Sequence, residues 1–152
     1  MKRSQINSAL QTAQSMLDGF RWALPRWADW ALEDYRADPQ MAAHLKAHQM
    51  GWDVTDFGSG DFTTRGLTLF CARNGIQSDP DSVPYAEKLL FVGEGQETPF
   101  HCHQQKMEDI INRGGGNLMV EFCHEDGRDA AIIISVDGRR VTLQPDDPLR
   151  LT

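Results

Sequence analysis

The N-terminal part of the chain places apolar side chains at helical spacing. The pattern predicts a first helix with Ser4 as its N-cap and Gly19 at its end. A second helix is predicted from about Pro25 to Arg36, where aromatic residues are available for packing. The positions that define the face of the first helix are Ile6, Leu10, Ala13 and Leu17.

A third helix is predicted between two clear end signals. Asp38 is a good N-cap followed by Pro39, and Gly51 stands where a left-handed C-terminal residue belongs. His44 and His48 lie four residues apart and therefore on one face. A metalloprotease helix would carry a glutamate after the first histidine, and here that position is a leucine. A second metal site at this pair is the less favoured alternative, and we interpret the pair as partly exposed helix histidines.

From Trp52 onward the pattern becomes that of β-strands. Leu67, Leu69 and Cys71 alternate towards Asn74-Gly75, a dipeptide that predicts a tight turn. Glycine turns are also predicted at 58–61, 126–127 and 137–138. Further strands are predicted near 86–92, 100–103, 108–112, 118–123, 130–136, 139–143 and from 149.

Many short strands joined by glycine turns predict an antiparallel sandwich or barrel. Residues 131–134 are nearly continuously apolar, as in a strand that is covered on both faces. A length of 152 residues suits one compact domain. We therefore expect a single domain over 1–152, with a helical prelude at about 1–51 packed on a partial β-barrel at about 52–152.

The net charge limits the classes of partner that we expect, and the cysteine content indicates the cellular compartment. The net charge of -7 argues against nucleic acid and against an anionic membrane, because both attract clustered Lys and Arg. The sequence has no apolar stretch of transmembrane length and no secretory pattern at its start. Three widely spaced cysteines do not suggest a disulfide framework, so we expect a cytoplasmic protein.

Residues 101–115 contain the candidate metal-binding residues. His101 and His103 are separated by one residue, so in a strand both side chains would lie on the same face. Glu108 follows after a connection long enough for the chain to turn back towards them. Two imidazoles and one carboxylate suit a divalent first-row metal with open positions for substrate. Cys102 would point away from the metal and is interpreted as a packing residue.

The spacing of these residues resembles the first motif of the cupin superfamily. Gly95, His101, His103, Glu108 and Gly115 meet every position of that motif. The run from His101 to the triple glycine at 114–116 also resembles the signature stretch of the D-lyxose isomerase family, and the resemblance extends along the chain. It implies a mainly β fold, a cupin-type antiparallel β-barrel (jelly roll) preceded by N-terminal α-helices.

The same resemblance implies an aldose–ketose isomerase acting on D-lyxose and D-xylulose, with D-mannose and D-fructose as a related pair. His101, His103 and Glu108 are the expected ligands of a divalent metal, with manganese as the expected ion. Lys106 is a candidate for catalysis and sugar binding, and Lys88 is a weaker candidate for sugar binding; a solvated lysine is the alternative for each. The partners implied are a small sugar and a second copy of the chain in a homodimer.

Members of the resembled family are longer, and their second cupin motif lies beyond Thr152. We therefore expect a C-terminally truncated form with an incomplete barrel, weak metal retention and little or no isomerase activity. Two alternatives stay open. The two-histidine, one-carboxylate set also serves iron-dependent oxygenases, and the chain could be a non-catalytic sugar- or metal-binding remnant.

Overall fold

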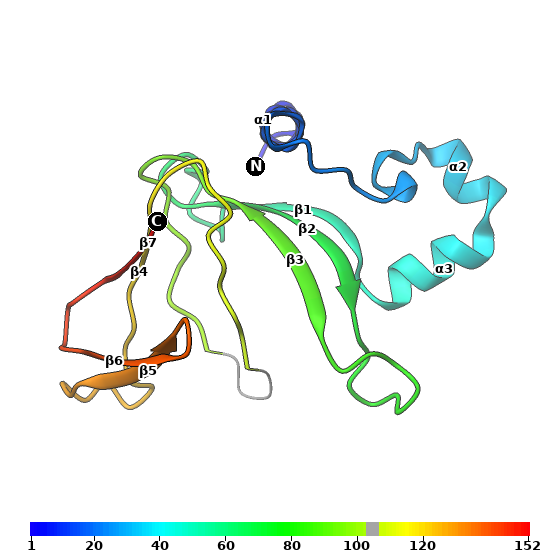
Figure 1. The fold of residues 1–152 in the computed structure, drawn as a ribbon. Helices are drawn as coiled ribbons and strands as arrows, with labels where there is room; N and C mark the ends of the chain where they lie inside the picture. Colours follow the sequence, from blue (N-terminus) through cyan, green and yellow to red (C-terminus); the bar gives the residue numbers. More distant parts are fainter. Residues whose placement is uncertain (103–106) are drawn as a thin grey trace. The chain divides into compact units, whose positions relative to one another are not determined.

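A computed structural model describes residues 1–102 and 107–152. These divide into two compact units, Met1–Pro99 and Phe100–Thr152 (Figure 1). Helices followed by antiparallel strands are confirmed. The arrangement of 1–152 as one domain stays a prediction. Among the described residues, no helix is both long and apolar enough to cross a bilayer.

The first unit begins with α1 (Arg3–Phe20), whose predicted ends were wrong. The N-cap is Lys2, not Ser4, because the Gln5 side chain accepts a hydrogen bond from the Lys2 backbone N–H at 2.7 Å. At the other end the backbone turns at Arg21 (φ 53°) rather than at Gly19. Ala13 and Leu17 of the predicted apolar face are buried and Ile6 and Leu10 are half-buried, so the face is confirmed, and Ala9 is buried beside it.

The second predicted helix is two short pieces, the 3-10 helix η1 (Arg26–Asp29) and α2 (Leu32–Ala37). The Asp34 carboxylate accepts a hydrogen bond from the Ala31 backbone N–H at 2.8 Å. This bond satisfies an N–H at the start of α2 and favours a new helix there rather than a continuous one.

The third helix, α3 (Pro39–Ala47), starts where the sequence predicted. The Asp38 carboxylate accepts from the Met41 backbone N–H at 2.9 Å, which confirms its role as N-cap. The predicted end at Gly51 was wrong. His48 is the C-cap, the left-handed residue is Gln49 (φ 51°), and Gly51 opens the first strand.

Three antiparallel strands form the sheet of this unit: β1 (Gly51–Thr55), β2 (Leu67–Asn74) and β3 (Ala86–Phe91), in the order β1-β2-β3. Asn74-Gly75 does not form a tight turn, which corrects the prediction. A longer loop follows, and the Gly75 N–H donates to the Tyr85 carbonyl at 3.0 Å to close it. A Cβ on Gly75 would overlap the Val83 carbonyl, so this close approach requires glycine.

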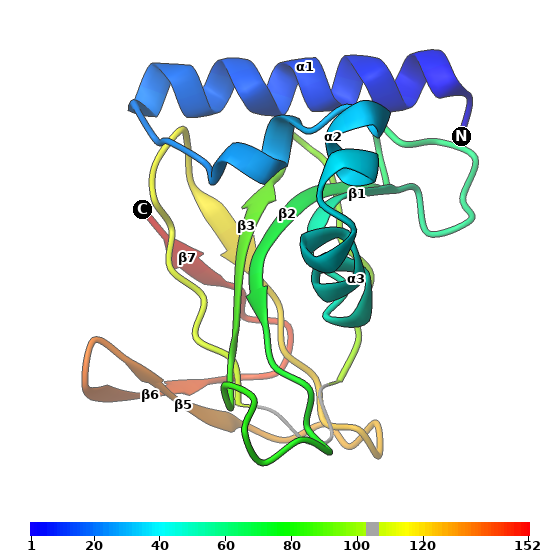
Figure 2. The same cartoon turned by 90° about the vertical axis from the view of Figure 1, so that its right-hand side faces the viewer.

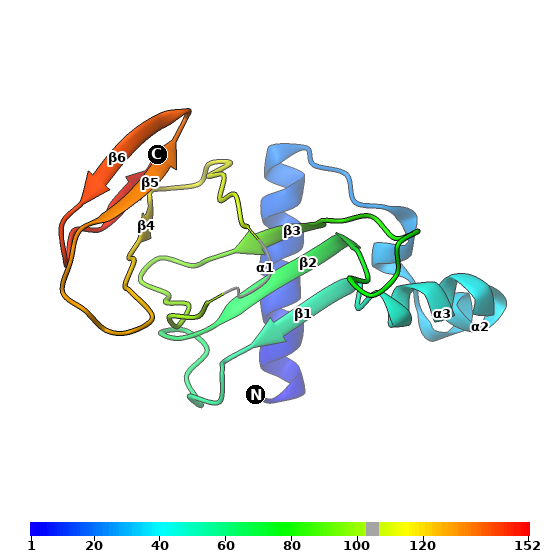
Figure 3. The same cartoon turned by 90° about the horizontal axis from the view of Figure 1, so that it is seen from below.

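The core of the unit lies between the sheet and the segments that contain Trp27 and Leu45. Phe70 is fully buried, and its ring stacks on Trp27 with centroids 5.1 Å apart. Trp52 meets Phe70 edge-on and donates its indole N–H to the Ala28 carbonyl at 3.2 Å. Figure 2 shows α2 and α3 beside the strands, and Figure 3 shows α1 running across the strand direction.

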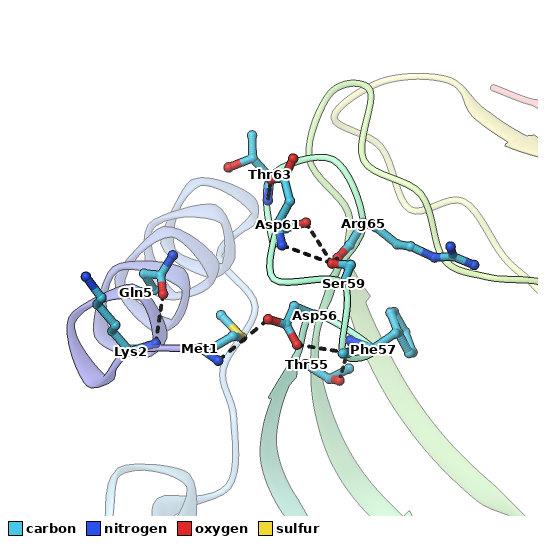
Figure 4. A network of polar contacts seen from close by, with 11 residues as sticks. Met1, Lys2, Gln5, Thr55, Asp56, Phe57, Ser59, Asp61, Thr63 and Arg65 are labelled. Carbon is cyan, nitrogen blue, oxygen red and sulfur yellow. Dashed lines mark hydrogen bonds and ion pairs between the residues drawn. The ribbon is translucent and has the colours of Figure 1, made fainter.

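Two aspartates organise the loop between β1 and β2 (Figure 4). The Asp56 carboxylate accepts from the Gly58 N–H at 3.0 Å and lies 3.6 Å from the Met1 amine, and the hydrogen bond and the positive charge lower its pKa. Hydrogen bonds from Thr64, and then from the Thr63 N–H, lower the pKa of Asp61. The loop is therefore held largely by polar contacts.

The strands among the described residues of the second unit form two separate pairs. β4 (Leu118–Val120) pairs with β7 (Leu149–Leu151), and β5 (Ile132–Val136) pairs with β6 (Arg139–Leu143), both antiparallel. Asp137 and Gly138 are both left-handed, which confirms the predicted turn between β5 and β6.

Three predictions for this unit were wrong. Residues 108–112 and the described residues 100–102 are not strands, because none of them joins a ladder. The apolar run at 131–134 is not covered on both faces, since Ile133 is 56% exposed. The strand predicted from 149, by contrast, is confirmed, because 149–151 pairs with β4.

Candidate metal and sugar site

The structure describes two of the three expected metal ligands. His101 and Glu108 are both exposed and lie in irregular backbone. Because 101–102 is not a strand, the side-chain alternation used to orient His101 and Cys102 does not apply there, and Cys102 is exposed rather than packed. His103 and Lys106 lie outside the described residues, so convergence of the three ligands stays a prediction.

No three His, Cys, Asp or Glu side chains of 1–102 and 107–152 form a group that could hold a metal ion. The expected set includes His103, which lies outside these residues. The donors themselves fit the expected ion, because imidazole and carboxylate are ligands that divalent first-row metals accept. With three protein ligands, such an ion would keep open positions for a substrate.

The two glycines that bound the motif both form turns. Gly95 has φ 69° and Gly115 has φ 92°, a left-handed region in which other residues are strained. Beside Gly95, the Gln96 side chain accepts from the Gly93 N–H at 3.0 Å and donates to the Phe62 carbonyl at 2.6 Å. This glutamine therefore ties the start of the motif to the loop between β1 and β2.

Asn112 holds the other end of the motif. Its side-chain oxygen accepts from the Gly114 N–H at 3.1 Å. Its amide nitrogen donates to the carbonyls of Gly116, at 2.8 Å, and Leu151, at 3.0 Å. One side chain thus shapes the triple-glycine turn and fastens it to β7. Asn112 belongs to the signature run, but the sequence alone did not reveal this role.

Lys88 lies in β3 with its Cα opposite that of Cys71. The neighbouring pair, Leu89 and Phe70, faces the core of the first unit. Because side chains alternate along a strand, Lys88 is on the opposite face of the sheet, where it is exposed. An exposed lysine on that face is compatible both with sugar binding and with simple solvation.

A sequence model of the D-lyxose isomerase family matches residues 1–152, the whole chain. The chain belongs to the D-lyxose isomerase family. Its relatives include the D-lyxose/D-mannose isomerase of Serratia proteamaculans, which is 42% identical over 157 residues, covering 99% of this chain and 69% of that protein. The D-lyxose/D-mannose isomerase of Escherichia coli O157:H7 is 39% identical over 158 residues, covering 100% of this chain and 70% of that protein. The family resemblance expected from the sequence is thereby confirmed.

Proposed function

We propose that this member of the D-lyxose isomerase family is a metal-dependent aldose–ketose isomerase. It interconverts D-lyxose and D-xylulose, with D-mannose and D-fructose as a second pair. The observation that carries the proposal is similarity along the whole chain to two proteins named D-lyxose/D-mannose isomerase. Similarity of that extent includes the signature run at 101–116 and is not confined to a shared motif.

His101, His103 and Glu108 are the proposed ligands of a divalent ion, and manganese is the ion we propose. When bound, the ion supplies a Lewis acid for the negative charge that develops on the sugar oxygens. Glu108 contributes the charge that a site of two neutral imidazoles lacks. The donor chemistry of these residues supports the proposal.

The lysines have the charge needed to bind a sugar that becomes anionic during the reaction. Moving a carbonyl from C1 to C2 requires removal of a proton from the carbon beside it, through an enediol. We propose that the Lys106 ammonium donates a hydrogen bond to the oxygen on which charge accumulates, and that Lys88 contacts a more distant hydroxyl. The exposure of Lys88 on the face opposite the Phe70 core supports its availability.

The finer fold and the assembly are part of the same proposal. We propose a cupin-type barrel for the strand region, a homodimer, and a cytoplasmic location. Antiparallel pairing in both units is compatible with the barrel, and three cysteines that form no disulfide suit a reducing compartment. Sedimentation of the purified chain tests the dimer directly.

The deciding experiment measures ketose formed from D-lyxose and from D-mannose by the purified chain, with and without Mn²⁺. The proposed function predicts Mn²⁺-dependent turnover, which would overturn the expectation of little or no activity that the missing second motif gave. It also predicts a loss of about 100-fold or more in E108Q, because the ion loses its charged ligand. E121Q, which changes another exposed glutamate, is the matched control and should keep its activity. Metal retention without ketose would favour a binding protein, and oxygen uptake with iron would favour an oxygenase.

A further inference from the structure

His44 and His48 form a close pair at the end of α3, far along the sequence from the expected metal ligands. Their ring centroids are 4.2 Å apart and the ring planes are tilted by 39°. His48 is the C-cap, with φ −89° and ψ 1°, so it stays close enough to helical geometry to keep the same face as His44. His44 is exposed and His48 is half-buried, as expected from the sequence.

A hydrogen bond fixes the tautomer of His48. Its Nδ1 lies 2.7 Å from the backbone carbonyl oxygen of Asn74. Because a carbonyl only accepts, Nδ1 must carry the hydrogen, and in the neutral ring Nε2 then carries the lone pair. The Asn74 side chain donates back to the His48 carbonyl at 2.8 Å, so the contact is reciprocal.

This arrangement is the one that metal-binding histidines commonly show. A ligand imidazole usually donates its second N–H to a carbonyl or carboxylate, which orients the ring and raises the basicity of the ligating nitrogen. For metal–nitrogen bonds of about 2.0–2.1 Å, two imidazoles in adjacent coordination positions have centroids roughly 4–5 Å apart. The observed centroid separation falls within that range.

We propose that His44 and His48 form a two-imidazole binding site for a late first-row divalent ion, and that Cu²⁺ is the ion bound most tightly. Imidazole nitrogen suits these ions, and affinity within the series rises to copper. Water completes the coordination, because one side of the pair is open to solvent at His44. Lys46 lies two residues from each histidine and therefore does not face the pair.

The test removes the other expected site first. In an H101A/H103A background, the remaining histidines are the pair and His124, whose Nδ1 lies 3.2 Å from Arg128 Nη2. Cu²⁺ added at one equivalent should give an electron paramagnetic resonance spectrum with coupling to two imidazole nitrogens. H44A in the same background should weaken Cu²⁺ binding by about 100-fold, because chelation by two linked ligands is lost.

H44A is the informative variant because His44 is exposed and its removal leaves the His48–Asn74 bonds in place. H124A is the control and should leave the two-nitrogen spectrum unchanged. Cu²⁺ affinity that survives H44A, or a spectrum without two imidazole nitrogens, overturns the proposal. The proposal is independent of isomerase activity, since the background variant lacks two of the proposed catalytic-metal ligands.

Discussion

The two units of the molecule are stabilised in different ways. All buried residues of the described part of the chain lie in Met1–Pro99. In this unit Phe70, Trp27 and Leu45 form an aromatic and aliphatic core. None of the described residues between 100 and 152 is buried. Apolar burial is the main favourable term in the first unit, whereas ladders, turns and side-chain hydrogen bonds stabilise the second.

The buried residues that stabilise the fold and the expected metal ligands therefore lie in different parts of the sequence. His101 and Glu108 belong to the second unit, in which irregular backbone and exposed side chains predominate. Segments with little apolar burial open at low free energy, and binding segments are often of this kind. We therefore expect core substitutions to unfold the first unit, and substitutions around the motif to change local order in the second.

The largest expected effect is that of F70A. Removing a fully buried aromatic ring should lower the free energy of unfolding by about 3–5 kcal/mol, because the core loses both burial and packing. The matched change in the second unit is I133A, at a residue that is 56% exposed, and it should cost about 0.5 kcal/mol or less. Urea unfolding followed by circular dichroism measures both variants, and tryptophan fluorescence follows the first unit alone, because all four tryptophans lie in it. Equal losses in the two variants would contradict the comparison.

G75A should be the next most damaging. A methyl group on Gly75 would overlap the Val83 carbonyl, and moving that backbone should cost about 1–3 kcal/mol. G19A is the control, because nothing lies within 4 Å of a Cβ at this helical position. It should stabilise α1 by about 0.5–1 kcal/mol. Thermal unfolding of both variants checks the opposite signs, and a neutral G75A would show that the loop adapts easily.

The sequence predicted elements best where one local signal decides the structure. Asp38 and Pro39 fix the start of α3, and Asp137-Gly138 fixes a turn, because capping and left-handed backbone depend on adjacent residues. Asn74-Gly75 carries an equally strong local signal, yet Gly75 instead bonds to Tyr85 across a longer loop. Tertiary hydrogen bonds overrode that local preference.

The candidate site shows the same limit. Residue type and spacing were sufficient to predict the family, which the family model confirms, whereas His101, His103 and Glu108 as metal ligands stay a prediction. Gln96 donates to the Phe62 carbonyl and Asn112 to the Leu151 carbonyl. Both acceptors are distant in the sequence, so no spacing pattern reveals these two roles. The strand expected around His101 also failed, because alternation predicts a face only after a ladder partner exists.

N112A tests whether side-chain hydrogen bonds hold the second unit. Alanine leaves the carbonyls of Gly116 and Leu151 without their amide donor, which should cost about 1–2 kcal/mol. We expect faster amide hydrogen exchange in the β4–β7 pair and unchanged exchange in β2. N117A, at a neighbouring exposed asparagine, is the control and should behave as the wild type. Unchanged exchange in N112A would show that the ladder alone suffices.

The smallest effect is the acid sensitivity of the β1–β2 loop. The pKa values of Asp56 and Asp61 are lowered in the folded protein, so both carboxylates stabilise it above their unfolded pKa of 3.8. That contribution is lost as the pH falls through the lowered folded values, because protonation weakens the hydrogen bonds and the contact with the Met1 amine. The difference in unfolding midpoint between pH 6 and pH 3 should therefore be slightly smaller in D56N/D61N than in the wild type. An unchanged difference in the variant would mean that other groups dominate acid unfolding of the first unit, and a larger one would contradict the stabilising role of the two carboxylates. A small reduction would show that the apolar core contributes more to stability than the polar loop.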